Sequence, residues 1–334
     1  MPNYLATRLV IPICTQSASA LSNPLQVVDP DIPTLASNLL RRVKVIFLLL
    51  LVWVCAGNAA TAAEALNSTA LQAKYKDLSV QLKNNQFQRP IYLDSAESTK
   101  ELAGNIYAVI DQPFASANRA LNNPANWCDM LILHLNTKYC RAGGGDGSNS
   151  LQVSIGKKHD QPLDDAYPVA FKFTAVASTP DYMHVALHAK EGPMGTSDYR
   201  ILLEAIPLAE GKTFLHLRYS YAYGIAARVA MKAYLSTAGS SKVGFTRLEG
   251  TRGDGSDGQY VGGVRGVVER NTMRYYLAID AYLSALKLPA SEQVEKRLQT
   301  WFDGTDRYAR QLKEVERNDY LAMKRREIQR QQSQ

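Results

Sequence analysis

The sequence predicts an α+β domain in which a curved antiparallel sheet of about seven strands is covered by one long helix near the C-terminus. Between residues 131 and 223, runs of alternating apolar and polar residues follow one another, which is typical of antiparallel strands. The segments between these runs are rich in Gly, Pro, Ser and Asp, which form turns. Residues 263–286 then carry a broad apolar and aromatic stripe at helical spacing, so one helix can cover the apolar face of the sheet.

The composition limits the class of protein. The chain has 334 residues, of which 46% are hydrophobic and 21% charged, so it has enough apolar material for a buried core. These values argue against an intrinsically disordered chain and against a polytopic membrane protein. The formal net charge of +7 comes from basic residues spread over the whole chain, which argues against a dedicated nucleic-acid surface.

One segment near the N-terminus predicts the compartment. Three basic residues at positions 41–44 precede an unbroken apolar run at 45–56, and small residues follow at 57–63. This is the layout of a secretory signal peptide, and we expect cleavage near Ala62 or Ala63 and a periplasmic location. The apolar run is about 18 Å long as a helix, well short of a hydrocarbon core of about 30 Å, so an uncleaved anchor is the weaker alternative.

The residues ahead of the signal segment lack regular periodicity. One hypothesis is that translation begins at a non-AUG codon near residue 39, 40 or 43. We therefore predict that residues 1–63 are an N-terminal extension and signal peptide that is absent from the exported protein.

Residues 64–100 predict an amphipathic helix and a short strand. The helix is expected at residues 66–84 and the strand at 91–95. The apolar residues of the helix recur at helical spacing: Leu71, Tyr75, Leu78 and Leu82. We expect this helix to lie over the main domain.

The main domain is expected at residues 101–288 and opens with a strand at 104–111. Two short helices follow at 114–122 and 125–130, separated by Asn123-Pro124. Six strands come next, at residues 131–139, 151–157, 169–178, 182–190, 198–207 and 212–223. In the last strand Tyr219, Tyr221 and Tyr223 alternate with polar residues, so one face of the sheet is expected to be apolar and aromatic.

Helices fill the rest of the chain. A helix at 225–235 and a Gly-rich loop at 250–258 precede the long helix at 263–286, which Pro289 ends. Residues 289–334 are expected to form a C-terminal helical extension with a frayed tail, in which helices span about 291–302 and 306–330.

Two cysteines remain after the expected cleavage, Cys128 and Cys140. In an oxidising compartment they most simply form a disulfide bond with each other, although two buried free thiols are the alternative. No neighbouring His or Cys completes a tetrahedral set around them, so we expect no metal there.

The element order of one strand, two short helices, six strands and a long helix resembles the START-like or Bet v 1-like helix-grip superfamily (SRPBCC). Residues 104–114 resemble the family's first strand and first helix, Asn126-Trp127 resembles the end of its second helix, and residues 207–213 resemble its last hairpin. The resemblance covers residues 102–287. It implies an apolar cavity between sheet and helix, which in this family usually holds a lipid, sterol or other apolar molecule; together with the predicted signal peptide, it suggests an exported bacterial member.

The candidate ligand-binding residues are aromatic residues expected to line this cavity, together with one aliphatic residue. They are Trp127, Tyr219, Tyr221, Tyr223, Tyr275, Tyr276 and Ile279. The alternative is a solid aromatic core without a ligand. Trp127 could instead pack against the adjacent cysteine bridge.

The sequence predicts no catalytic set, metal or cofactor. His184 and His188 are four residues apart on a strand, hence about 13 Å apart and too far for one ion. Nucleophile-elbow, HExxH and Walker motifs are absent from the sequence. Some members of the superfamily are cyclases or hydrolases, and an enzyme here would have to use isolated groups such as Asp111 or Glu204 with a tyrosine.

We therefore expect an exported, periplasmic protein that binds an apolar small molecule or lipid and does not bind nucleic acid. Two alternatives remain, a cavity enzyme of the cyclase or hydrolase type and an envelope protein-protein interaction module with a filled core. The basic segment 307–330 is expected to be a docked surface helix. Peripheral contact of this C-terminal helix with the anionic membrane is its alternative.

Overall fold

The computed structural model describes residues 68–143, 149–224, 229, 242–248 and 260–333. The predicted signal segment, almost all of the helix expected at 225–235 and the Gly-rich loop at 250–258 lie outside these residues.

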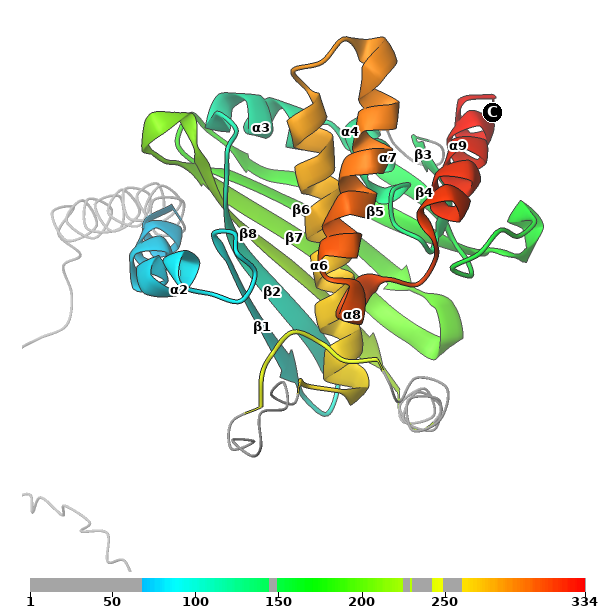
Figure 1. The fold of residues 1–334 in the computed structure, drawn as a ribbon, viewed down its shortest axis with the longest axis horizontal. Helices are drawn as coiled ribbons and strands as arrows, with labels where there is room; N and C mark the ends of the chain where they lie inside the picture. Colours follow the sequence, from blue (N-terminus) through cyan, green and yellow to red (C-terminus); the bar gives the residue numbers. More distant parts are fainter. Residues whose placement is uncertain (1–67, 144–148, 225–228, 230–241, 249–259, 334) are drawn as a thin grey trace, which may run out of the picture. The chain divides into compact units, whose positions relative to one another are not determined.

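Eight antiparallel strands form one sheet in the order β1-β2-β8-β7-β6-β5-β4-β3 (Figure 1). The strands are β1 (Ile91–Glu97), β2 (Glu101–Ile110), β3 (Thr137–Ala142), β4 (Ser150–Ile155), β5 (Tyr167–Ser178), β6 (Met183–Glu191), β7 (Thr196–Pro207) and β8 (Thr213–Tyr223). The predicted α+β class and curved antiparallel sheet are confirmed. The short strand expected at 91–95 is β1, and its pairing with β2 makes it the eighth strand.

Most helices lie where the sequence predicts them, but α7 is longer than expected and the single helix expected at 306–330 is divided into α8 and α9 by the non-helical residues 313–316. They are α2 (Ser79–Lys83), α3 (Phe114–Leu121), α4 (Pro124–Leu131), α6 (Gly263–Ala285), α7 (Ala290–Arg307), α8 (Ala309–Leu312) and α9 (Arg317–Ser333). Residues 68–77 are also helical and lead into α2. The long covering helix is α6, so the helix-grip arrangement is confirmed.

The strand predicted at 131–139 is wrong in its first half. The backbone N–H groups of Leu133 and His134 donate to the carbonyls three residues before them, so this segment continues α4 as a turn. Strand β3 begins only at Thr137. Leu131, Ile132 and Leu133 are all buried, and consecutive buried residues do not have the two-residue period of a one-sided strand.

Helix α6 lies directly against the concave face of the sheet at Gly104 of β2. A Cβ atom at this position would overlap Thr272 Oγ1 of α6. Glycine therefore permits the helix and the sheet backbone to approach each other here. On the two sides of this contact, Val268 and Ile279 of α6 are buried in the main hydrophobic core.

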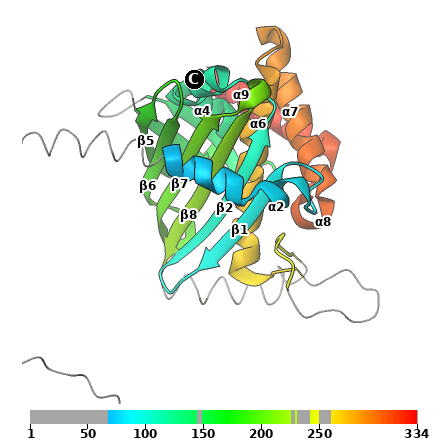
Figure 2. The same cartoon turned by 90° about the vertical axis from the view of Figure 1, so that its left-hand side faces the viewer.

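The helical segment 68–83 packs on the convex face of the sheet. Its buried residues Leu71, Leu78 and Leu82 contact Tyr182, Ile206 and Phe214, which form a second hydrophobic cluster. Figure 2 shows this segment in blue across the strands, with α6 and α7 on the opposite side. The expected position over the main domain is thus confirmed, and part of the convex face is apolar.

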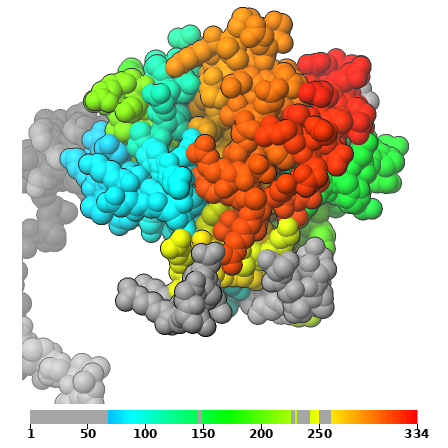
Figure 3. All heavy atoms as spheres, viewed as in Figure 1, coloured from blue at the N-terminus to red at the C-terminus, as the bar shows by residue number. Residues whose placement is uncertain are grey.

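Helices α7 and α8 pack on α6, and α9 packs on α7 and β3; Figure 3 shows these helices as orange to red spheres on one face of the molecule. The Trp301 indole of α7 stacks on the Tyr320 ring of α9, with ring centroids 4.8 Å apart. The Trp301 indole N–H donates to the backbone carbonyl of Arg274 in α6. Residues of the C-terminal extension therefore belong to the same hydrophobic core as the sheet.

A buried ionic cluster fixes α9 to β3. The Glu327 carboxylate lies 3.1 Å from Lys138 Nζ of β3 and 2.8 Å from Lys324 Nζ of α9. The three side chains are at most 1% exposed. Lys324 Nζ also donates to the backbone carbonyls of His134 and Thr137, and burial lowers its pKa to about 8. The C-terminal helix is thus docked on the domain.

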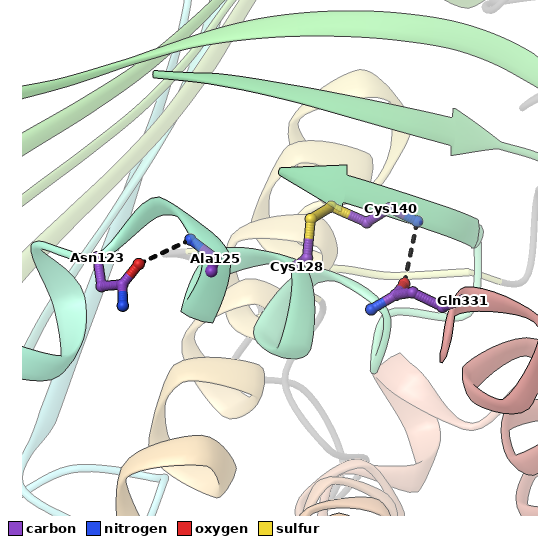
Figure 4. The surroundings of a disulfide bond; sticks show 5 residues. All are labelled: Asn123, Ala125, Cys128, Cys140 and Gln331. Atoms are coloured by element: carbon purple, nitrogen blue, oxygen red, sulfur yellow. Dashed lines mark hydrogen bonds between the residues drawn. A yellow bond between two sulfur atoms is a disulfide. The ribbon is translucent and has the colours of Figure 1, made fainter. Parts of the chain in front are cut away.

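Cys128 of α4 and Cys140 of β3 lie at disulfide distance, with 1.98 Å between their sulfur atoms (Figure 4). The side chain of Asn123 caps α4 by accepting a hydrogen bond from the backbone of Ala125. On the other side of the bridge, the Cys140 backbone N–H donates to Gln331 of α9. The bridge therefore joins α4 to the outermost strand.

Removal of the bridge is expected to lower the free energy of unfolding by about 3 kcal/mol, because the unfolded chain loses a covalent loop. Cys128→Ser/Cys140→Ser and the wild type can be compared by urea denaturation, with and without a reducing agent. The reductant should destabilise the wild type and leave the double variant unchanged. A wild type that is insensitive to reduction would contradict the bridge.

Glu327→Gln is expected to lower the free energy of unfolding by about 3 kcal/mol or more, because it leaves two buried ammonium groups without a carboxylate. Arg325→Ala is the matched control on the same helix. It removes a solvent-exposed ion pair with Glu295 and should change the stability by less than about 1 kcal/mol. Equal effects of the two substitutions in urea denaturation would show that the buried cluster does not anchor α9.

Candidate functional site

A cavity of about 390 Å³ begins beside the Gly104 contact, where Tyr219 of β8 pairs with Gly104, and extends between α6 and the strands toward β4. Strands β4, β5, β7 and β8, the loop after β4 and the turn before β7 complete its wall. Ile155, Val169 and Phe171 form its aliphatic and aromatic floor. The cavity exists because the sheet curves away from the straight helix beyond the point where the two touch.

Tyrosine rings line the cavity where β7 and β8 face α6. The Tyr219 ring of β8 lies 5.0 Å from that of Tyr275 on α6 and 6.2 Å from that of Tyr199 on β7. Tyr221 stacks on Tyr199 from behind, with ring centroids 5.2 Å apart. Burial raises the pKa of Tyr199, Tyr219 and Tyr275, so their hydroxyls stay neutral and can donate hydrogen bonds.

The structure places two of the seven predicted ligand-binding residues on the cavity wall, Tyr219 and Tyr275. Tyr221 is buried behind them, and the Tyr223 hydroxyl lies at the end of β8, where it donates to the backbone carbonyl of Ser98. These two residues extend the tyrosine cluster away from the cavity.

The other three predicted residues are packed in the core. The Tyr276 hydroxyl accepts a hydrogen bond from Arg89, and Ile279 is buried in the main core. The Trp127 indole N–H donates to the backbone carbonyl of Leu121. Its ring faces Phe173 at 6.5 Å. None of these three is among the described residues that line the cavity.

His134 is a polar residue of the cavity wall. Its side chain belongs to the turn after α4, the residue is 3% exposed, and its ring stacks on Tyr275 with centroids 4.9 Å apart. Its Nδ1 accepts a hydrogen bond of 3.1 Å from the backbone N–H of Asn136. We therefore assign the ring proton to Nε2. This buried Nε2 has no hydrogen-bond partner among the described residues.

The imidazole of His134 is neutral. Burial lowers its pKa well below 6.5, and the cations Arg274, Lys324 and Lys158 lower it further. Protonation would also break the bond from Asn136, because Nδ1 would become a donor. The ring is consequently held in one orientation with its N–H buried, and it does not act as a base.

Two carboxylates near this wall are outnumbered by cations. Glu314 lies within 3.4 Å of Lys158, Lys242 and Arg274, while Glu327 neutralises only part of the charge of Lys138 and Lys324. Burial opposes the ionisation of Glu314, but the hydrogen bond and charge of Lys158 lower its pKa overall. The electrostatic potential behind His134 is therefore positive.

The candidate residues that an enzyme was expected to use lie elsewhere. Glu204 is on the convex face, where it binds the Tyr182 hydroxyl and lies 3.0 Å from His216 Nδ1. Asp111 is exposed and lines a different surface pocket beside Arg89 and Asp280. Neither carboxylate reaches the cavity between the sheet and α6.

The sequence interpretation missed Tyr199, His134 and Asn271 as lining residues. Tyr199 could have been found, because it alternates with Ile201 and Leu203, which are buried on the same face of β7. Asn271 precedes the stripe residue Thr272 and gives no signal of its own. His134 stands in a segment that was interpreted as a strand, so its orientation was not predictable.

The strand order, the covering helix and this cavity together define a helix-grip protein of START-like and Bet v 1-like architecture. No protein-family model and no curated protein matches the sequence. Structures with some similarity are a START superfamily protein from Mycobacterium smegmatis and norcoclaurine synthase from Thalictrum flavum. The first is 8% identical over 38% of this chain and 79% of that chain, with a TM-score of 0.28. The second is 13% identical over 45% and 80%, with a TM-score of 0.29.

Among the described residues, no helix is long and apolar enough to cross a membrane. Likewise, the described part of the chain brings together no group of three His, Cys, Asp or Glu side chains that could hold a metal ion.

The neutral state of His134 predicts a pH dependence of stability. Its folded pKa lies below 6.5, so between pH 7.5 and 5.5 the unfolded chain binds a proton that the folded chain does not. The free energy of unfolding should fall by about 1 kcal/mol from this residue as the pH decreases. Urea denaturation at the two pH values can measure this change in the free energy of unfolding. In His134→Gln, which lacks the imidazole, the change should be smaller than in the wild type by about 1 kcal/mol. Equal losses would contradict the neutral assignment.

Proposed function

We propose that this protein is exported and binds a compact apolar molecule in the cavity between the sheet and α6. The observation that carries the proposal is the unfilled volume of about 390 Å³ walled by Phe171 and by the rings of Tyr199, Tyr219 and Tyr275. The cleft opens to solvent beside the exposed residues Lys157, Asp165 and Met194, so a ligand can enter it from outside.

The size of the cavity limits the ligand. Small-molecule sites usually measure about 300–1,000 Å³, so this one fits a compact molecule better than a long-chain lipid. Burial of about eight methylene-sized groups would contribute about 6 kcal/mol before the cost of ordering is subtracted. Apolar burial alone can thus supply a large part of a useful affinity.

Export is the second part of the proposal. Cys128 and Cys140 lie at disulfide distance, which suits an oxidising compartment. The predicted signal segment at 41–63, with cleavage near Ala62 or Ala63, accounts for delivery to the periplasm.

Binding accounts for the cavity better than catalysis does. His134 offers no free basic nitrogen, because its Nδ1 accepts from Asn136, and Asp165 is exposed at the rim. An acid-base mechanism needs a group that can accept a proton near the substrate. The interaction module with a filled core is likewise less favoured, because the volume under α6 is open.

Ile155→Trp is expected to abolish ligand binding, because the indole would occupy the cavity from β4. Native mass spectrometry of the protein from the periplasm of its own host should show a bound small molecule in the wild type and none in this variant. Val176→Trp, at an exposed position of β5, is the matched control and should keep the molecule.

A wild type isolated without any bound small molecule would contradict the binding proposal, and so would a variant that retains it. Absence of the protein from the periplasmic fraction would contradict export.

A further inference from the structure

We propose that the outer edge of β1 is a docking site for an extended acidic peptide segment of another protein, which pairs with β1 as a further strand of the sheet. The site shares no lining residue with the cavity under α6, so it is a second binding site beyond the proposed function. Three observations carry the proposal, which are the free backbone groups of the edge, the groove in which the edge lies and the positive charge of one wall of this groove.

The backbone groups of β1 alternate between its partner β2 and the open edge. At the start of the strand the Val109 N–H donates to the Pro90 carbonyl. At its other end the Ser98 N–H donates to the Glu101 carbonyl. In this antiparallel register the even-numbered residues of β1 therefore bond to β2, and the odd-numbered residues point away from it. The outward N–H and C=O of Leu93 have no hydrogen-bond partner among the residues that the structure describes, so they can bond to the backbone of another strand.

The edge of β1 lies in a groove of about 450 Å³. Residues 91–95 all line it, whereas a site on one face of a strand would be lined by alternate residues. Residues 84–87 after α2 form the wall on the convex side, and residues 246–247 with Arg265 of α6 form the wall on the concave side. Figure 1 shows β1 at the margin of the sheet, next to α2 and the yellow segment 242–248. Walls on both sides of the edge admit one extended chain and exclude the broad edge of a second folded sheet.

Hydrogen bonds fix the two walls of the groove. The Gln86 side chain links them, because its Nε2 donates to the Phe245 carbonyl at 2.6 Å and its Oε1 accepts from Arg247 Nε at 3.1 Å. The buried carboxylate of Glu269 in α6 accepts from the backbone N–H groups of Phe245 and Thr246. The groove is therefore formed before a peptide binds, which lowers the entropic cost of binding.

Two arginines give the concave wall a positive charge. Arg247 is exposed, and Arg265 is half-buried against β1, where its guanidinium donates to the Ser95 carbonyl at 3.2 Å. Among the described lining residues the carboxylate is that of Asp94, which accepts a hydrogen bond from Asn105 on the convex side. Acidic side chains of a peptide would thus meet two guanidinium groups on the concave side. Because Arg265 occupies the Ser95 carbonyl, we expect the peptide to pair with the first half of β1.

The two edges of the sheet differ in their protection. At the opposite edge, Gln331 of α9 accepts from the backbone N–H of Cys140 in β3, and α9 packs on this strand. At β1, Arg265 is the described side chain that bonds to an outward backbone group. Exposed strand edges are usually blocked in proteins, so an accessible edge inside a preformed groove points to a binding function.

Two peptides test the proposal, acetyl-Thr-Glu-Val-Glu-Val-Glu-Thr-amide and its counterpart with lysine in place of glutamate. Their affinities for the full exported protein can be measured by isothermal titration calorimetry. The glutamate peptide should bind at least about fivefold more tightly, because its charge complements the two arginines. Arg247→Glu should remove this preference. Arg119→Glu, at an exposed position of α3, is the matched control and should leave the preference unchanged.

Hydrogen exchange of single backbone amides tests the geometry without a substitution. In the free protein the outward N–H of Leu93 should exchange faster than the N–H of Asp94, which bonds to β2. A saturating amount of the glutamate peptide should slow the exchange of Leu93 at least about tenfold and leave Asp94 unchanged.

Several results would overturn the proposal. Absence of binding by the glutamate peptide at millimolar concentration, equal binding of the two peptides, or an unchanged preference in Arg247→Glu would exclude an acidic strand as the occupant. Protection of the Leu93 amide in the free monomer would show that another segment of the same chain occupies the edge. Protection that rises with protein concentration, together with dimerisation in analytical ultracentrifugation, would assign the edge to a second copy of the chain. The cavity ligand is tested separately by native mass spectrometry, so failure of one proposal leaves the other intact.

Discussion

The close contact between α6 and the sheet at Gly104 is the constraint on which the rest of the structure depends. Thr272 Oγ1 occupies the space that a Cβ on Gly104 would need, so the helix lies directly on the backbone of β2. A straight helix that touches a twisted sheet so closely at one place must separate from it elsewhere. The separation lies over β4 and β5, and the cavity results from it.

The C-terminal extension shapes the same cavity from the other side. Lys324 of α9 binds the backbone carbonyl of His134, while Glu314 binds Lys158 in the loop that walls the cavity after β4. Lys138 donates to the backbone carbonyl of His159 in that loop. The extension therefore holds residues of the cavity wall in place through Lys324, Glu314 and Lys138.

Most of the fold and part of the site could be predicted from the sequence. The strands and the long helix are predicted by hydrophobic periods of two and 3.6 residues, which can be read from the local sequence alone. The same alternation placed Tyr219 toward the cavity, and the helical stripe placed Tyr275 there. His134 could not be predicted, because its burial and neutral state depend on Arg274 and Lys324, which are more than 100 residues away in the chain. Whether a tyrosine lines a cavity or packs behind it, as Tyr221 does, depends on side chains from several elements.

The bond from Cys140 to Gln331 has a consequence for the solubility of the protein. Strand β3 is the last of the sheet, and its free backbone groups could pair with a strand of another molecule. Gln331 occupies one of these N–H groups, and the bulk of α9 lies against the same strand through Lys138. Helix α9 therefore hinders the pairing of β3 with a strand of another molecule. A chain without α9 would expose β3 as an edge strand and would be more prone to aggregation.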